Sequence, residues 1–200
     1  MLYSYFKIAL RVIIKNHFHV TINILGMGIA VAVALVSFVN LRNYQQYDAQ
    51  HENKDRIYRL ISERKIDDAF TPYGLSPIGL ADDLKSNFPE FNSISRYDLQ
   101  QEIVINQEKI FRERVAFTDV DFTSMFTLKK LVGEISLTDK TDILLSESAA
   151  LRYFINSDNA LGNLIQVKTD KGEKLTFTVA GIFKDFPENS SFNFDVLLSI

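Results

Sequence analysis

The stretch 20–41, VTINILGMGIAVAVALVSFVNL, contains 22 residues and no charged side chain. As an α-helix rising about 1.5 Å per residue it would be roughly 33 Å long, enough to cross about 30 Å of bilayer hydrocarbon. A buried core helix is one alternative, but uncharged runs of this length are rare in soluble domains. The stretch therefore predicts one transmembrane helix over residues 20–41.

A cleaved signal peptide is the second alternative. Residues 30–34, AVAVA, contain the A-x-A pattern that a signal peptidase accepts. The apolar region of a signal peptide is typically about 7–15 residues long, and its small residues follow that region. Here the run is longer and the small residues lie in its middle, which favours a helix that is retained in the membrane.

Charge is distributed unevenly along the chain. Residues 1–42 carry four basic residues and no acid, whereas the whole chain has a net charge of −3, which leaves −7 for residues 43–200. Three of the four basic residues precede the apolar run. The positive-inside rule then places residues 1–19 in the cytoplasm and residues 42–200 outside it. The acidic remainder argues against nucleic acid as a partner, because phosphate neutralisation requires basic side chains.

Small residues mark one side of the predicted membrane helix. Gly26, Ala30 and Ala34 recur every four residues, as do Gly28 and Ala32. Small residues at this spacing let another helix approach closely in lipid. The plainer explanation is that glycine and alanine are common in membrane helices. We favour a packing face formed by the first three, because a lone anchor does not need one.

Residues 2–15 have the pattern of an amphipathic helix. Lys7, Arg11 and Lys15 fall on one stripe, and apolar side chains fall on another. A basic amphipathic helix ahead of a membrane span is expected at the cytoplasmic interface, with its charges near anionic headgroups. The alternative is that the segment simply extends the membrane helix inward.

Residues 42–200 combine short strands with short helices, so the predicted fold class is α+β with mainly antiparallel strands. Alternating apolar residues predict a hairpin over 99–117 and a second hairpin over 164–183, the latter turning at Asp170-Lys171-Gly172. The other predicted strands are 56–64, 142–145 and 192–198. Since the last pattern continues almost to residue 200 without a cap or polar tail, we expect a fragment of a longer polypeptide; a strand that closes the sheet is the alternative.

Helix starts are predicted from residues that favour the N-cap position. Ser76, followed by proline, is expected to open a helix that ends before Pro89. Ser146 is expected to cap a helix that reaches Phe154, and Asp119 to cap a single turn ending near Phe126. Phenylalanine pairs are expected in the core and at interfaces rather than around a cofactor: Phe183 with Phe186, and Phe192 with Phe194.

Motifs for catalysis and for binding a cofactor or metal are absent from the sequence. It contains no P-loop, no G-x-S-x-G, no H-E-x-x-H and no cysteine, which excludes disulfides and thiolate chemistry. Glu113, Asp119 and Asp121 lack the glycine and distal glutamate of a calcium loop, so we interpret them as helix-capping and surface groups. We therefore nominate no catalytic, cofactor-binding or metal-binding residue and predict that the chain is not an enzyme.

Five strings carry a family resemblance, in order and at sensible spacing: FKIALRVIIKNHFHVTINILGMGIAVAVAL, YDAQHENKDRIYRL, FTDVDFTSMF, ILLSESAALRYF and VAGIFKDFPENSSFNFDVLLS. They resemble the opening segment, first membrane helix and following periplasmic core domain of MacB/FtsX-type ABC transporter permeases. The resemblance covers nearly the whole chain. Because members of that family continue through further membrane helices, it implies that the chain holds the first helix and most of the first periplasmic domain.

The resemblance implies a function and a location. It implies a permease subunit in a bacterial inner membrane, with a separate ATPase on the cytoplasmic side and a periplasmic domain that moves for export or mechanotransmission. The implied partners are that ATPase, other permease helices or a second permease copy, and membrane lipid, with no cofactor in this chain. The alternative function is a single-span, membrane-anchored domain that binds an extracytoplasmic ligand or acts as a sensor.

Overall fold

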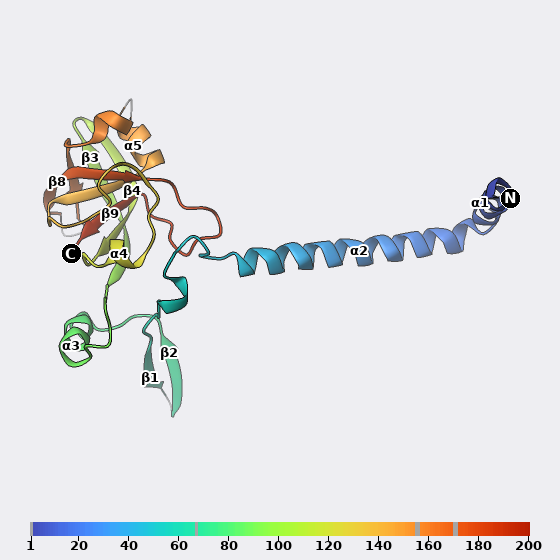
Figure 1. The fold of residues 1–200 in the computed structure, drawn as a ribbon, viewed down its shortest axis with the longest axis horizontal. Coiled ribbons are helices and arrows are strands. Elements are labelled where there is room, and N and C mark those ends of the chain that lie inside the picture. Colours follow the sequence, from blue (N-terminus) through green and yellow to red (C-terminus); the bar gives the residue numbers. More distant parts are fainter. Residues whose placement is uncertain (1, 67, 155–156, 170–171) are drawn as a thin grey trace. The chain divides into compact units, whose positions relative to one another are not determined.

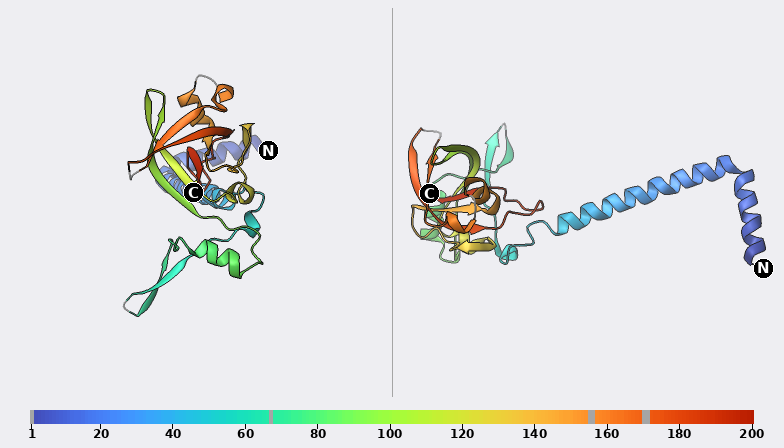
Figure 2. Two further views of the ribbon diagram at one scale, coloured as in Figure 1. Left: turned by 90° about the vertical axis from the view of Figure 1, so that its left-hand side faces the viewer. Right: turned by 90° about the horizontal axis from the view of Figure 1, so that it is seen from above.

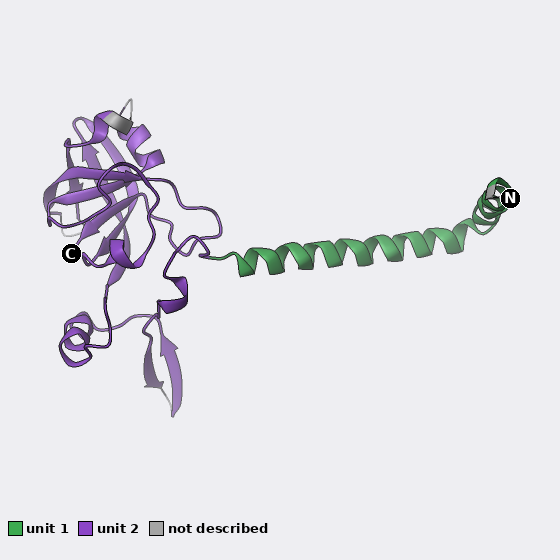
Figure 3. Ribbon diagram, viewed as in Figure 1, with its two compact units in different colours: residues 1–47 green, residues 48–200 purple. Residues whose placement is uncertain are grey.

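The computed structural model describes residues 2–66, 68–154, 157–169 and 172–200 and divides the chain into two compact units (Figure 3). Met1–Tyr47 forms the first unit and Asp48–Ile200 the second. The first unit is helical, and the second holds every strand in the described part of the chain (Figure 1).

Two helices make up the first unit. α1 (Leu2–Lys15) covers the residues expected to form the basic helix, and α2 (His17–Gln45) contains the apolar run. With 29 residues α2 is about 43 Å long, which matches a bilayer with its headgroups. It is the one helix among the described residues that is long and apolar enough to cross a membrane. None of its residues is buried against protein, so it is not the buried core helix of this chain.

The second unit is built around a seven-stranded sheet in the order β5-β8-β6-β9-β4-β3-β7, in which β7 also pairs with β8. This extra pairing closes every strand except β5 into a ring (Figures 1 and 2). Only β4–β9 and β6–β8 are parallel pairs, which confirms an α+β fold with mainly antiparallel strands. The strands are β3 (Tyr97–Asn106), β4 (Lys109–Thr118), β5 (Lys130–Gly133), β6 (Asp142–Ser146), β7 (Leu164–Lys168), β8 (Lys174–Phe183) and β9 (Val196–Ser199).

The central strands of this sheet are buried on both faces. In β6, Ile143 and Leu145 belong to one apolar core, which also contains residues of α5 (Glu147–Tyr153). Leu144, between them, belongs to a second core rich in phenylalanine. β9 divides its side chains between the two cores in the same way. A strand covered on both faces needs apolar residues at every position, which explains the uninterrupted runs ILL and VLL.

The predicted phenylalanine pairs lie in or against the second core. Phe183 and Phe194 are buried in it, and Phe186 and Phe192 pack beside them. The ring centroids are 5.6 Å apart for Phe183 and Phe186 and 6.0 Å apart for Phe192 and Phe194. The interpretation as core residues is therefore confirmed.

One of the three predicted helix caps is confirmed. Ser146 accepts the backbone N–H of Ala149 at 3.2 Å and starts α5. The prediction for Ser76 is wrong, because α3 (Leu80–Asn87) begins after Gly79 and has no side-chain cap. The prediction for Asp119 is also wrong, since the N-cap residue of α4 (Phe122–Met125) is Asp121, two residues later, and its side chain makes no cap hydrogen bond.

The Asp119 carboxylate has a stronger partner than a helix end. It accepts two hydrogen bonds from the Arg96 guanidinium, at 2.5 and 3.0 Å, and a third from the Arg96 backbone N–H at 2.7 Å. Burial alone would raise the pKa of Asp119, but these bonds bring it below its usual value. Asp119 is thus an ion-pair residue that fixes the entry to β3.

Glu113 is not a surface group, contrary to the sequence interpretation. Only 7% of it is exposed, and it pairs with Arg152 of α5 at 2.7 Å. Arg152 also reaches Asp195 at 3.4 Å, and Asp195 pairs with Arg114 at 3.0 Å. These four charges tie α5 to β4 and to the segment ahead of β9.

Two predicted strands differ from the structure. The segment 57–61 is unpaired, and the strand expected over 56–64 begins later, as β1 (Ser62–Ile66) in a hairpin with β2 (Ala69–Tyr73). Over 192–198 strand pairing begins only at Val196, and the preceding Phe192 and Phe194 lie outside the strand. β7 and β8 pair as predicted, and positions 170–171 of their predicted turn lie outside the described residues.

Candidate functional site

A cluster of hydrogen bonds holds the first residues of the second unit. The Asp48 N–H donates to the Asn189 carbonyl at 3.0 Å, and the Asp48 carboxylate accepts the Ser191 N–H at 2.7 Å. The hydroxyls of Ser190, at 3.3 Å, and Ser191 donate to the same carboxylate. Gln50 adds a bond from its amide to the Ser190 hydroxyl at 2.8 Å. Asp48 is thereby joined to a loop about 140 residues further along the chain.

The next residues bind a different loop. The N–H of Thr127 donates to His51 Nδ1 at 3.1 Å, and the N–H of Glu52 donates to the Thr127 hydroxyl at 3.0 Å. The Asn53 amide donates to the carbonyls of Ser124 and Met125, both at 3.3 Å. We call residues 48–53, together with residues 124–127 at and after the end of α4 and the loop 189–192, the juxtamembrane clasp, since α2 ends only three residues before Asp48.

His51 is the buried centre of the clasp. Only 3% of it is exposed, and the rings of Phe126 and Phe192 meet it edge-on at 5.4 and 5.6 Å. Because Nδ1 accepts a hydrogen bond, the proton of the neutral ring lies on Nε2, which is buried without a partner and 3.9 Å from an Asp48 oxygen. Burial lowers the pKa of His51, and the Asp48 charge offsets only part of that effect.

The clasp brings an aspartate, a histidine and two serines together, but not as a catalytic triad. In a triad the serine hydroxyl bonds to the histidine and the histidine to the acid. Here one His51 nitrogen is occupied by the Thr127 N–H and the other has no partner. Both serine hydroxyls donate directly to the Asp48 carboxylate. This arrangement provides no activated nucleophile among these four residues.

The clasp should weaken on acidification. Because burial lowers the pKa of folded His51 below its usual 6.5, the unfolded chain binds this proton more readily. The stability that neutral His51 allows is fully present above about pH 6.5, the usual pKa of histidine. It is lost as the pH falls from there toward the lower pKa of His51 in the folded protein. Protonation would also place a hydrogen on Nδ1, opposite the Thr127 N–H. We expect His51→Asn, which keeps an acceptor and does not titrate, to flatten the fall in stability between about pH 7 and about pH 5.

Denaturant unfolding of the full chain in detergent, measured across this pH range, checks the expectation. His19→Asn, on the exposed helix α2, is the matched control and should leave the wild-type slope unchanged. Parallel stability curves for wild type and His51→Asn would show that His51 does not control the pH response.

The residues nominated from the sequence all belong to the first unit, whereas the clasp belongs to the second. Gly26, Ala30 and Ala34 are exposed along α2, and a Cβ at Gly26 would meet no atom within 4 Å. This open side could receive another helix, and its packing role stays a prediction. The basic residues Lys7, Arg11 and Lys15 are exposed on α1, and their role also stays a prediction.

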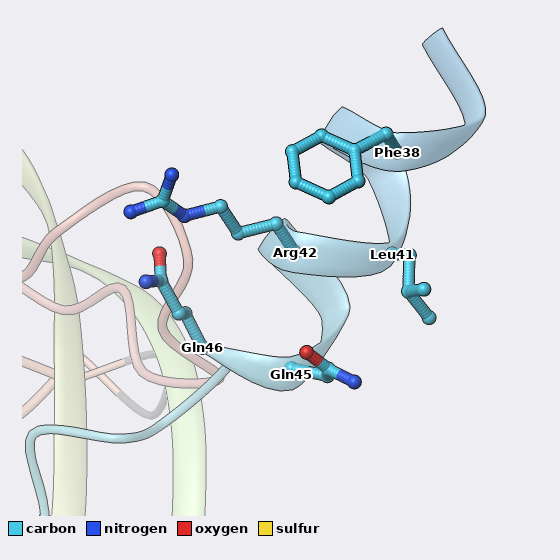
Figure 4. A pocket seen from close by; sticks show the side chains of 5 residues that line it. All are labelled: Phe38, Leu41, Arg42, Gln45 and Gln46. Atoms are coloured by element: carbon cyan, nitrogen blue, oxygen red, sulfur yellow. The ribbon is translucent and has the colours of Figure 1, made fainter. Parts of the chain in front are cut away.

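The carboxyl end of α2 has a hollow of about 310 Å³ on its surface (Figure 4). Its lining comes from this one helix end, where apolar side chains give way to a guanidinium and two amides: Phe38, Leu41, Arg42, Gln45 and Gln46. Such a change is typical of the level at which a membrane helix leaves hydrocarbon for headgroups. It is a helix surface and not an enclosed binding cleft. Among the described residues, no cluster of histidine and acidic side chains could hold a metal ion.

The clasp residues were not nominated from the sequence, although all of them except Thr127 lie in strings that carry the family resemblance. Asp48 and His51 belong to YDAQHENKDRIYRL, Met125 to FTDVDFTSMF, and Ser190 and Ser191 to VAGIFKDFPENSSFNFDVLLS. The structure brings these three strings together at one place. The available signal in the sequence was that these residues belong to the strings that carry the family resemblance.

Comparison with known proteins identifies the family. The chain matches the MacB-like periplasmic core domain over residues 20–200. A crystallised domain of a protein named as a permease from Porphyromonas gingivalis is 24% identical, with a TM-score of 0.55, over 70% of this chain and 60% of that one. The periplasmic region of MacB from Actinobacillus actinomycetemcomitans is 21% identical, with a TM-score of 0.46, over 61% and 54%.

The chain thus covers less than two thirds of the length of either solved structure. No curated protein sequence matches it. The family match covers α2 from residue 20 onward and the whole described sheet, and the Porphyromonas domain shares the fold. The chain belongs to the family of MacB-like periplasmic core domains.

Proposed function

We propose that this chain is part of the permease subunit of an ABC transporter, in which a separate ATPase drives movement of residues 48–200 on the periplasmic side of a bacterial inner membrane. One observation carries the proposal. The family match begins at residue 20, where the uncharged run begins, and continues through the sheet to residue 200. Membrane helix and sheet are therefore one family unit, and not a sheet attached to an unrelated anchor.

The proposed mechanism is a rigid-body movement. ATP binding by the partner would shift the cytoplasmic ends of the membrane helices, and tilting of α2 would displace the domain that follows it. α1 would lie along the inner leaflet, beside the ATPase, with Lys7, Arg11 and Lys15 facing anionic groups. α2 would pack through Gly26, Ala30 and Ala34 against other permease helices or a second copy. ATP hydrolysis itself takes place in the partner.

Orientation is tested most simply by labelling single cysteines, because the chain has none of its own. Ser4 on α1 and Glu90 after α3 are both exposed. In spheroplasts, a membrane-impermeant thiol reagent should label Glu90→Cys directly and Ser4→Cys only after the membrane is opened. The reverse pattern would place the domain in the cytoplasm and refute the proposed function.

The packing face of α2 can be tested with two identical substitutions on opposite sides of the helix. Ala30 and Ala32 lie about 200° apart at roughly 100° per residue. We expect Ala30→Leu to weaken association of the permease helices by about 1–3 kcal/mol, because the added side chain separates the backbones. Ala32→Leu should leave assembly intact. Co-purification of differently tagged permease subunits measures the difference, and equal assembly of both variants would indicate a lipid-facing helix.

A further inference from the structure

We infer that the juxtamembrane clasp is the joint through which displacement of the chain beyond α2 enters the sheet, with Asp48 as its principal positioning residue. This inference rests on the proposed function and adds the residues that transmit the movement. The second unit follows α2 directly along the chain. α2 ends at Gln45, and Asp48 is the first residue of the second unit, so a displacement that passes along the chain reaches Asp48 first.

Asp48 is bonded more densely than an ordinary connecting residue. Its backbone N–H and both carboxylate oxygens are engaged by Asn189, Ser190 and Ser191. Hydrogen bonds to an ionised carboxylate are shorter and stronger than neutral ones. Asp48 also has a φ of +55°, a left-handed conformation that aspartate tolerates better than most residues. The turn therefore requires a residue that accepts this backbone and supplies an anionic acceptor.

The two loops of the clasp continue into different parts of the sheet. The loop 189–192 leads through Phe194 and Asp195 into β9, which lies between β6 and β4 in the ring. The backbone of Asp195 is itself fixed. Its N–H donates to the Arg114 carbonyl at 2.9 Å, and its carbonyl accepts the Ser146 backbone N–H at 2.8 Å. Residues 124–127 lead instead to β5, which lies at one end of the strand order. Pulling on Asp48 thus acts on a central strand, and pulling on His51 acts on an edge strand.

The aromatic side chains behind the clasp favour transmission over local bending. Phe126 and Phe192 contact each other at 4.7 Å between ring centroids, and each contacts His51. Phe192 also meets the buried Phe122 at 5.2 Å. Close-packed interiors transmit strain because their side chains have little free volume to yield into. The β1–β2 hairpin offers the contrast, since its second strand is exposed throughout and it projects from the ring (Figures 1 and 2).

A matched pair of substitutions separates the joint from its backbone geometry. Asp68 also has a left-handed conformation, with a φ of +62°, but it lies in the hairpin turn and pairs only with exposed Lys65 in the described structure. We expect spin labels at Ala49→Cys and Lys140→Cys, two exposed positions of the second unit, to give a narrow distance distribution in an otherwise wild-type chain and in Asp68→Ala. In Asp48→Ala the distribution should broaden, because the start of the second unit is no longer held to the loop 189–192.

The coupling itself is tested in the permease reconstituted with its ATPase, using a fluorophore at Lys140→Cys and a lipid-borne quencher. We expect ATP to change the quenching in wild type and in Asp68→Ala, and Asp48→Ala to lose most of that change with ATP hydrolysis maintained. The double variant Asp48→Cys/Ser191→Cys gives a second test, in which open and crosslinked forms of one protein are compared. Its fluorophore is attached enzymatically to a peptide tag, because a thiol label would react with the two new cysteines. The reduced form should be uncoupled, and closure with a short thiol crosslinker should restore the change.

The outcomes distinguish the two proposals. If wild type shows no ATP-dependent change, the proposed function fails and the clasp has nothing to transmit, so both are overturned. If wild type responds and Asp48→Ala responds equally, or if crosslinking leaves the double-cysteine form unchanged, the clasp inference alone is overturned.

Discussion

Reversing the three charges of α1, as Lys7→Glu/Arg11→Glu/Lys15→Glu, should uncouple the permease from its ATPase. The three residues are exposed and follow one another at four-residue spacing on α1. Each basic residue near an anionic surface contributes on the order of 1 kcal/mol, so removing three loses about 3 kcal/mol. A loss of about 3 kcal/mol weakens binding of α1 to an anionic surface roughly a hundredfold. The three introduced glutamates add repulsion to this loss. The second unit should remain folded, because none of the three substitutions lies in it.

Membrane insertion should survive this change, because the uncharged run supplies far more free energy than three charges do. Since the reversal also weakens the orientation signal, binding and stimulation of ATPase activity must be measured only on chains shown by thiol labelling to have the N-terminus inside. The control reverses three exposed basic residues of the second unit, Lys109, Lys140 and Lys174, and should leave ATPase binding unchanged. Wild-type binding and stimulation in the α1 variant would mean that α1 is a passive interfacial helix.

Truncating Phe122 should destabilise the second unit more than any surface change. The side chain is fully buried and contacts four rings, those of Tyr97, Phe126, Phe192 and Phe194. Phe122→Ala removes these contacts and leaves a cavity, at a cost of about 3–5 kcal/mol. For a unit of this size the midpoint of thermal unfolding should fall by about 10 °C.

Phe70→Ala is the matched control, because Phe70 on β2 is 69% exposed. Its effect should stay within about 0.5 kcal/mol. Near-ultraviolet circular dichroism of tyrosine and phenylalanine follows the unfolding, since the chain has no tryptophan. Equal melting temperatures for the two variants would show that the cluster around Phe122 is not the main core. Since Phe126 and Phe192 also flank His51, Phe122→Ala should in addition loosen the clasp.

Features with a short sequence period were predictable. β3 and β4 were expected from alternation over 99–117, and the cap at Ser146 from a serine ahead of a helical pattern. The length of the uncharged run likewise predicted the long apolar helix. In each case neighbours within a few residues determine the local structure, so a single sequence contains the necessary information.

Features that depend on distant partners were missed. Asp119 was expected to cap a helix because its long-range partner Arg96 could not be identified from spacing. Glu113 was interpreted as a surface group although it lies in phase with Phe111 and Val115, which face the core. That phase was a usable signal, and the balancing charge of Arg152 explains how a carboxylate can be buried there.

The clasp was the least predictable feature. Its hydrogen bonds join residues about 75 and 140 positions apart, and side-chain bonds to loop backbones have no periodic pattern. The same bonds give Asp48 and Ser190 a structural role in segments without regular secondary structure. A buried polar group costs free energy unless it is paired, and Asp48 and Ser190 are paired with each other across the clasp.

The most direct test of this account is whether ATP turnover by the partner moves the periplasmic domain. In the reconstituted complex, a lipid-borne quencher acts on a fluorophore at Lys140→Cys. The extent of quenching reports the distance of the second unit from the periplasmic surface of the inner membrane. The account predicts one quenching level without nucleotide, a different level when ATP is bound by a hydrolysis-deficient ATPase, and a return to the first level after hydrolysis. A single level in all three states would contradict it.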